Sequence, residues 1–269
     1  MDAETRAGSA QVDSERAAYE EGVVFERSDA WNKRVLHVFH APNTERGEML
    51  FATLIGEAAQ NGGRVLDAGC GTGDTARRAV ELGAGDVLAV ELSERFLQEA
   101  QRRGDGEGKI EYRLHDLHDP IEGRFDLVVG RSILHHIDWR PFLRRTYSEN
   151  LAPGGRMAFM EPMSHPMTIA FHRIVREAHT PGEYPLSRSD VRWLEQTFPR
   201  CGVHPINFLT FPAGVLSSYI FRSPDNSLTR ASDAIDRRLE RRGRLRGYAR
   251  QGIIVIDKPG SVEDQPAAS

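Results

Sequence analysis

From Arg64 onward, short runs of apolar residues alternate with amphipathic segments of helical length, and this alternation constrains the fold more than any other feature of the chain. Parallel strands are joined by crossover helices, so the pattern predicts an α/β fold with a doubly wound, mostly parallel sheet and helices on both faces. Seven strands are expected, at 64–69, 86–92, 109–116, 125–132, 155–162, 203–211 and 252–257.

The helices expected between these runs fall into two groups. Three of them alternate with the first five strands, at 72–82, 93–103 and 140–151. After the fifth strand the rhythm breaks, and helices are expected at 165–179, 187–198 and 228–246. The second of these is expected to be capped by Ser187 or Ser189. No crossover helix of the usual kind separates the last two strands, so they are expected to form an antiparallel edge.

Composition divides the chain into a core unit with flanking segments. Residues 12–60 carry apolar side chains at helical spacing, with a break at Pro42-Asn43 and Asn43 or Thr44 as the cap of the second helix. The two ends lack such periodicity and are expected to be disordered. The expected organisation is a disordered 1–11, an N-terminal helical extension 12–60, an α/β domain 61–257 with a helical cap at about 163–200 and a helical insertion at about 213–249, and a disordered tail 258–269.

Charge and cysteine content exclude several classes of protein. The chain has 35 basic and 39 acidic residues, a net charge of −4, so a nucleic-acid partner is not expected. Only Cys70 and Cys201 are cysteines, which excludes a disulfide framework and a four-cysteine zinc site, and no metal is expected. Neither an apolar leader nor about 18 consecutive apolar residues is present, so we expect a cytoplasmic protein without a membrane partner.

The strongest motif is VLDAGCGTGD at residues 65–74, an expected strand that enters a glycine-rich turn and then a helix. Glycines allow the sharp turn and let a ligand approach the backbone. The dinucleotide-binding fingerprint is G-x-G-x-x-G, but the sixth position counted from Gly69 is Asp74. Acidic Asp67 and Asp74 flank the loop, so it suits a cationic ligand better than a pyrophosphate.

Two further acidic residues follow the next two strands. Glu91 ends the second strand, 91 − 69 = 22 residues after Gly69, where a carboxylate can accept hydrogen bonds from both hydroxyls of a ribose. Asp116 ends the third, where it can accept from the amino group of an adenine, with Leu117 against the ring. A ligand with ribose, adenine, an amino-acid head and no phosphate is S-adenosylmethionine.

With these motifs the sequence resembles the class I, Rossmann-like S-adenosylmethionine-dependent methyltransferases over about residues 60–160. The resemblance rests on DAGCGTG at 67–73, Glu91-Leu92, Asp116-Leu117, FDLVVGRSILHHI at 125–137 and LAPGGRMAF at 151–159. It implies that the glycine loop packs the methionine moiety, that the strand-two acid holds the ribose, and that the strand-three aspartate reads the adenine. The implied cofactor-binding residues are Asp67, Gly69, Cys70, Gly71, Gly73, Glu91, Leu92, Asp116, Leu117 and Arg131.

Candidate catalytic residues follow the fourth and fifth strands. Neighbouring histidines on a helical turn point about 100° apart, so we expect His135 to face the acceptor and His136 to be structural. Glu161 is expected to orient a histidine, and His165 either shuttles a proton or caps the next helix. Tyr19 is a further candidate, on N-terminal helices that are expected to close the site as a lid.

The expected reaction is methyl transfer to a small, largely apolar natural product of secondary metabolism. The chain lacks the N-P-P-Y motif with which related nucleic-acid methyltransferases hold a target nitrogen, and it is rich in aromatic residues after the fifth strand. One alternative is C-methylation of an alkene in a prenylated substrate, with carbocation rearrangement or cyclisation. Alternatives of other classes are an NAD(P)-dependent oxidoreductase and a non-catalytic cofactor-binding module. A homo-oligomer is possible.

The arginine-rich run at 237–246 has two interpretations. Such a run can attract an acidic partner. Asp233 and Glu240 stand at i, i+4 spacing to arginines, which instead indicates an exposed helix held by salt bridges. We expect the salt-bridged helix.

Overall fold

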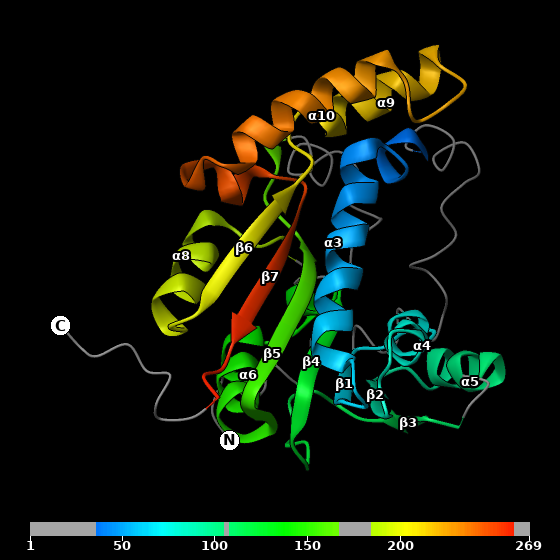
Figure 1. Cartoon of the computed structure of the whole chain (residues 1–269), viewed down its shortest axis with the longest axis vertical. Helices are drawn as coiled ribbons and strands as arrows, with labels where there is room; N and C mark the ends of the chain where they lie inside the picture. The colour runs from blue at the N-terminus through cyan, green and yellow to red at the C-terminus, as the bar shows by residue number, and fades with distance from the viewer. Residues whose placement is uncertain (1–35, 105–107, 167–183, 261–269) are drawn as a thin grey trace.

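The computed structural model describes residues 36–104, 108–166 and 184–260, and a seven-stranded sheet forms its centre (Figure 1). The strand order is β3-β2-β1-β4-β5-β7-β6. β1 to β5 are mutually parallel, whereas β7 runs antiparallel to both of its neighbours, β5 and β6. This confirms the predicted mostly parallel sheet and its antiparallel edge. The strands are β1 (Arg64–Ala68), β2 (Asp86–Glu91), β3 (Ile110–Leu114), β4 (Phe125–Arg131), β5 (Leu151–Pro162), β6 (Cys201–Ile206) and β7 (Gln251–Asp257).

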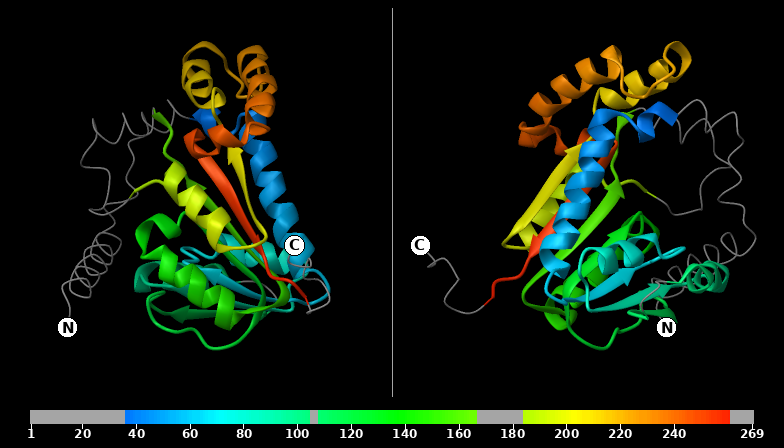
Figure 2. Two further views of the ribbon diagram at one scale, coloured as in Figure 1. Left: turned by 90° about the vertical axis from the view of Figure 1, so that its left-hand side faces the viewer. Right: turned by 45° about the vertical axis from the view of Figure 1, so that its right-hand side comes forward.

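Helices cover both faces of the sheet, as predicted (Figure 2). The described helices are α3 (Pro42–Ala59), α4 (Asp74–Glu81), α5 (Glu94–Arg103), α6 (Trp139–Arg145), α8 (Arg188–Thr197), α9 (Thr210–Ile220) and α10 (Ser227–Glu240). Three short turns complete them, η1 (Leu134–His136), η2 (Thr146–Asn150) and η4 (Gly243–Tyr248). Ser187 caps α8 through a reciprocal capping box, which confirms one of the two predicted cap residues.

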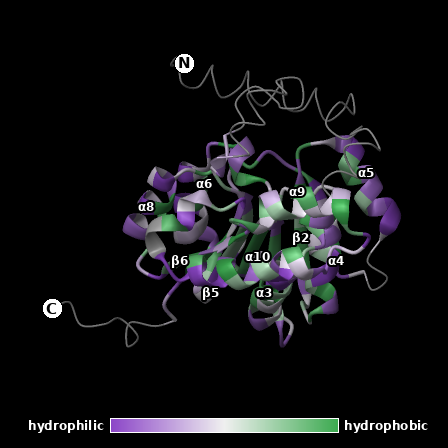
Figure 3. Ribbon diagram, turned by 90° about the horizontal axis from the view of Figure 1, so that it is seen from above, coloured by the Kyte–Doolittle hydropathy of each residue, from purple (hydrophilic) through white to green (hydrophobic). Residues whose placement is uncertain are grey.

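The alternation of side chains along each strand divides the core into two layers. Val65 and Leu127 face α3 and α4, while Leu66, Val128 and Phe159 face α6 and α8. Because both layers are apolar, both faces of the central strands are buried, and these strands appear in the sequence as continuous apolar runs. Hydrophobic residues accordingly gather on the central strands, and hydrophilic residues on the outer helices (Figure 3). No helix among the described residues is long and apolar enough to cross a bilayer.

The predicted cap of the second N-terminal helix is wrong. α3 begins at Pro42 with Ala41 as its N-cap and without a side-chain cap; proline suits the first helical position because it has no N–H that needs an acceptor and already has a helical φ. Asn43 and Thr44 are instead buried within the first turn. Asn43 donates to the carboxylate of Asp236, and Thr44 donates to the carbonyl of Val38.

Three predicted boundaries also differ from the structure. The helix predicted at 140–151 is present from Trp139 to Asn150, with a π-helical last turn from Thr146, but β5 starts at Leu151 rather than residue 155. Lys258, which the sequence places in a disordered tail, is ordered and donates to the carbonyls of Tyr147 and Leu151, so it holds this corner of the chain. The strand predicted at 203–211 ends at Ile206.

A buried carboxylate explains why that strand ends early. Asp236 on α10 accepts hydrogen bonds from the amides of Phe208, Leu209 and Thr210 at distances of 2.8–3.1 Å. These amides belong to the start of α9, so a residue of one helix caps the neighbouring helix. α9 and α10 lie side by side at one end of the molecule (Figures 1 and 2). Because the cap lies about 27 residues along the chain, no local pattern indicates it.

Replacing Asp236 by alanine is expected to lower the free energy of unfolding by about 3 kcal/mol, because several buried donors lose their acceptor at once. Urea unfolding followed by circular dichroism measures this change. Asp225→Ala serves as the control, since Asp225 forms only a surface ion pair with Arg230 and should leave the urea midpoint unchanged. Equal midpoints for wild type and Asp236→Ala would contradict the capping role.

Candidate active site

The glycine-rich loop joins β1 to α4 at the carboxyl ends of the parallel strands. The amides of Gly69 and Cys70 both donate to the carbonyl of Val90 at 2.9 Å, which fixes the loop beside β2. Two of its glycines differ in what surrounds them. A Cβ on Gly69 would lie 2.4 Å from Cδ1 of Ile133, whereas a Cβ on Gly71, at φ 51°, would meet no atom within 4 Å. Gly69 therefore serves packing, and Gly71 exposes backbone to a ligand.

Asp67 lies directly beneath this loop and is the least satisfied polar group of the region. Its side chain is 1% exposed, and neither carboxylate oxygen has a hydrogen-bond partner among the described residues. Burial raises the pKa of Asp67 to about 7; the backbone amide of Ala76 opposes this shift, and the negative charges of Glu91 and Asp74 contribute to it. Buried polar groups normally have partners, so this carboxylate is suited to a cation that binds in the loop.

Glu91 ends β2 and holds the loop from the other side. Its Oε2 accepts from the amide of Gly71 at 2.9 Å, and its Oε1 accepts from the amides of Leu92 and Ser93 at 2.9 and 3.0 Å. Burial raises the pKa of Glu91, while these three amides oppose the shift. The carboxylate is thus fixed in position beside Gly71.

Asp116 and Leu117 follow β3 at the same edge of the sheet. Oδ1 of Asp116 accepts from the backbone amide of His118 at 2.9 Å and lies 2.7 Å from Nδ1 of its ring. Leu117 is buried, and its carbonyl accepts from the guanidinium of Arg145. The structure therefore brings Asp67, Glu91 and Asp116 to neighbouring strand ends, in the order β3-β2-β1. Their roles toward a nucleoside stay predictions.

His135 and Glu161 form a pair where β4 and β5 end. Oε1 of Glu161 accepts from the amides of Ile133 and Leu134 at 2.8 and 2.9 Å, and its Oε2 lies 2.8 Å from Nδ1 of His135. With Nδ1 donating to the carboxylate, neutral His135 has Nε2 as an acceptor, and Nε2 has no partner among the described residues. The predicted contact of Glu161 with a histidine is present. The geometry suits a general base.

Comparisons with known proteins show what the chain is similar to. Residues 65–155 match the family model described as "Methyltransferase domain". The chain is 43% identical over 75 residues to magnesium-protoporphyrin O-methyltransferase of Rhodobacter capsulatus (27% of this chain, 33% of that one). It is 32% identical over 114 residues to ubiquinone biosynthesis O-methyltransferase of Bordetella avium (41% and 47%). Residues 65–155 therefore belong to a methyltransferase domain.

Solved structures share the fold at low sequence identity. Magnesium protoporphyrin IX methyltransferase of Synechocystis, solved with S-adenosylhomocysteine bound, has a TM-score of 0.57 and 14% identity, and the match covers 92% of this chain and 99% of that one. The family and fold predicted from the sequence are thereby confirmed, and an oxidoreductase is not favoured. The present chain spans less than half the length of the first curated relatives it matches.

Arg131 ends β4 within the methyltransferase domain but does not direct its side chain to the glycine loop. Its guanidinium forms a two-contact ion pair with Glu48 of α3 and lies 5.5 Å from the ring centre of Phe51. Arg131, which the sequence predicts to bind the cofactor, can therefore contact a ligand at the glycine loop only through its backbone. Ser132, the next residue, has a φ of 54°, and this turn brings the following amides to Glu161. No sequence motif indicates the roles of Glu48 and Ser132.

The other predicted catalytic residues differ in their surroundings. His165 is buried after β5, where its Nε2 lies 3.2 Å from the carbonyl of Phe208 and its ring packs on Phe211. Burial lowers the pKa of His165, so it is mainly neutral and serves the β6–α9 connection. The ring of His136 lies 4.0 Å from that of His135. Tyr19 and the rest of the predicted lid up to residue 35 lie outside the described residues, as do residues 167–183 of the predicted cap.

Within the described ranges, no group of three or more His, Cys, Asp or Glu side chains has the geometry of a metal site. Burial raises the pKa of Cys70, so its thiol stays protonated inside the loop.

The raised pKa of Asp67 predicts a pH-dependent stability in the absence of ligand. The folded state holds a proton up to a pKa of about 7, whereas the unfolded carboxyl loses it near its ordinary value of 3.8. The folded state therefore binds more protons between these limits, and this contribution to stability falls as pH rises from about 4 to 7. The full difference is on the order of 4 kcal/mol.

Urea unfolding of wild type and Asp67→Asn at pH 5 and pH 8 measures this contribution. Other titrating groups cancel in the comparison, so the variant should gain stability relative to wild type at pH 8. A constant difference between the two proteins at both pH values would show that Asp67 does not titrate in this range.

Proposed function

We propose that this protein transfers a methyl group from S-adenosylmethionine to a small, largely apolar acceptor of natural-product metabolism. One observation carries the proposal. An open glycine loop over the unpartnered Asp67 and a paired His135–Glu161 lie at the carboxyl ends of neighbouring strands of one sheet. The first suits a cationic nucleoside and the second suits removal of a proton, and open α/β sheets bind ligands at this edge.

The residues present fit S-adenosylmethionine. The free approach to Gly71 admits a ligand backbone, and the acidic surroundings of Asp67 and Asp74 favour a cation over a pyrophosphate. In this proposal Glu91 and Asp116, at the next two strand ends, hold ribose and adenine. The cofactor supplies a methyl group already activated by a sulfonium. Asp67, Gly69, Cys70, Gly71, Gly73, Glu91, Leu92, Asp116 and Leu117, with the backbone of Arg131, form the proposed binding set.

The protein's own contribution is to position the acceptor and to accept its proton. Nε2 of His135 takes the proton of an acceptor hydroxyl or amine, while Glu161 holds Nδ1–H and stabilises the imidazolium that results. The two amides that bind Glu161 keep the pair aligned with the sheet edge. Proton removal combined with positioning typically contributes several kcal/mol.

Two observations support a small acceptor and transfer to oxygen. α9, which follows the carboxyl end of β6, leaves the apolar side chains of Leu216, Tyr219 and Ile220 exposed, as an apolar acceptor would require. Two curated relatives are named O-methyltransferases, one for magnesium-protoporphyrin and one in ubiquinone biosynthesis. A base is central to O-methylation, so the His135–Glu161 pair does not favour the alkene alternative.

Gly71→Ala tests the cofactor site against a matched control, Gly62→Ala. Both glycines have a positive φ and open space at Cβ, so each variant should lose about 1 kcal/mol of stability from backbone strain. Only Gly71→Ala should weaken binding of S-adenosylhomocysteine, by roughly tenfold or more, because its methyl group occupies the open side of the loop. Calorimetric titration measures both. Equal affinities in the two variants would remove the loop from the binding site.

His135→Gln tests the proposed base, with His136→Gln as the neighbouring control. Transfer of radiolabel from S-adenosylmethionine to a panel of small phenols and catechols should fall about 10²–10⁴-fold in His135→Gln and change little in His136→Gln. Binding of S-adenosylhomocysteine should stay within about twofold of wild type in both. Unaltered turnover in His135→Gln would reject the base, and cofactor binding without transfer to any acceptor would favour a non-catalytic module.

A further inference from the structure

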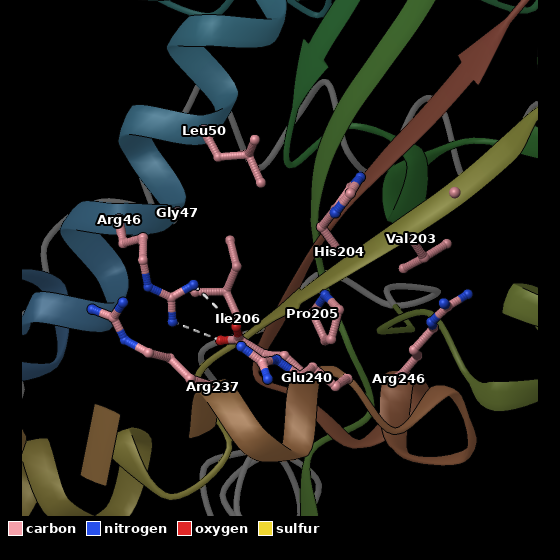
Figure 4. A pocket seen from close by; sticks show the side chains of 12 residues that line it. Arg46, Gly47, Leu50, Val203, His204, Pro205, Ile206, Arg237, Glu240 and Arg246 are labelled. Carbon is pink, nitrogen blue, oxygen red and sulfur yellow. Dashed lines mark hydrogen bonds and ion pairs between the residues drawn. The ribbon is translucent and has the colours of Figure 1, made fainter. Parts of the chain in front are cut away.

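A pocket lies at the edge of the sheet that β6 forms. It has a volume of about 410 Å³ and is enclosed by the N-terminal half of α3, the edge strand β6, and the end of α10 with η4 (Figure 4). β6 stands four positions from β1 in the strand order, roughly 19 Å at the usual strand spacing. The pocket is therefore separate from the proposed active site, and its ligand has to be inferred from its own residues.

The floor of this pocket is apolar. Leu50 of α3 and Ile206 of β6 line it on the α3 side of the sheet, and Val203 and Pro205 line it where the pocket passes around the edge strand. Gly47 allows α3 to approach β6 so closely that a Cβ there would lie 2.5 Å from Cδ1 of Ile206. An apolar surface of this kind favours a ligand with a hydrocarbon or aromatic body.

The rim carries four arginines, of which two pair with carboxylates of α10, although Nε of Arg46 is buried without a partner. Arg46 donates to both oxygens of Glu240 at 2.8 and 3.0 Å and to Asp233 at 3.0 Å, and its pairing with Glu240 is visible in Figure 4. Arg237 donates to Asp233 through two nitrogens. The Asp233–Arg237 contact confirms one predicted i, i+4 salt bridge, whereas Glu240 pairs with Arg46 of α3 instead of an arginine of its own run.

The other two arginines keep unused donors. Arg241 has no ion pair with any described residue. Arg246 pairs with Glu195 through Nη1 alone, and its Nε is buried without a partner. Arg241 and the remaining N–H groups of Arg246 thus have no acceptor among the described residues. His204 adds a polar ring without a charge, because burial and the proximity of Arg246 lower its pKa.

We propose that this pocket binds a small organic anion, with its carboxylate or phosphate on Arg241 and Arg246 and its apolar body on the floor. Guanidinium groups pair with planar or tetrahedral oxyanions through two N–H donors. An inorganic ion would leave the apolar floor exposed to water. A neutral apolar ligand would instead remove water from the unpaired guanidinium groups and leave them without a hydrogen-bond partner.

Calorimetric titration of the full chain with octanoate, octyl phosphate, octanol and inorganic phosphate tests this proposal. Octanoate or octyl phosphate should bind, and the stronger of the two identifies the head group. Octanol and inorganic phosphate should bind at least about tenfold more weakly, since each lacks one half of the recognition. Affinity should fall with added salt, as a charge contact requires.

Variants locate the bound anion. Arg241→Gln should weaken binding about tenfold, whereas Arg238→Gln, on the same helix but outside the pocket, should not. Gly202→Val should also abolish binding without unfolding the chain, because a Cβ at Gly202 meets only Nε2 of His204, at 3.8 Å. S-adenosylhomocysteine should bind all three variants like wild type.

Three outcomes would overturn the proposal. The first is the absence of heat with both octyl anions. The second is equal binding of octanoate to wild type, Arg241→Gln and Gly202→Val. The third is displacement of octanoate by S-adenosylhomocysteine, which would place the anion in the active site instead.

Discussion

Both oxygens of the Glu161 carboxylate are hydrogen-bonded at zero exposure, and the candidate active site depends on this arrangement. The backbone amides at the start of η1 offset the cost of burying the charge, and the remaining oxygen fixes the tautomer of His135. Because Glu161 belongs to β5 and the amides follow β4, the pairing of two central strands sets the position of the base. A shift of either strand by one residue would turn Glu161 to the other face of the sheet.

Asp67 is buried at the same edge without such compensation. Burial raises the pKa of Asp67, whereas the carboxylate of Glu161 has three hydrogen-bonding partners. A fold that only maximised stability would fill this position with an apolar or a hydrogen-bonded residue. The contrast between two carboxylates, one fully satisfied and one not, places the ligand at the glycine loop and the acid–base chemistry beside it.

The sequence predicts those parts of the molecule that depend on local pattern. Apolar runs and crossover helices determine the sheet, and acids at consecutive strand ends meet because parallel strands share one carboxyl edge. The predictions are wrong where a residue that is distant in the sequence determines where an element begins or ends. Asp236 ends β6 and starts α9, and Lys258 orders the beginning of β5 from about 107 residues away. Arg131 pairs with Glu48, which lies 83 positions away in the sequence. No local pattern indicates this pair, and the sequence therefore predicts that Arg131 faces the cofactor.

α3 contacts both the proposed active site and the pocket at β6, and it does so through different residues. Successive helical residues are about 100° apart, so Glu48 reaches Arg131 at the end of β4 while Arg46 and Leu50 face β6. The ion pairs of Arg46 and Glu48 fix the position of α3 along the direction of the strands. A ligand that displaced Glu240 from Arg46 would therefore disturb the end of β4 through a rigid helix. An anion held by Arg241 and Arg246 leaves those pairs intact, so the two sites are expected to bind independently.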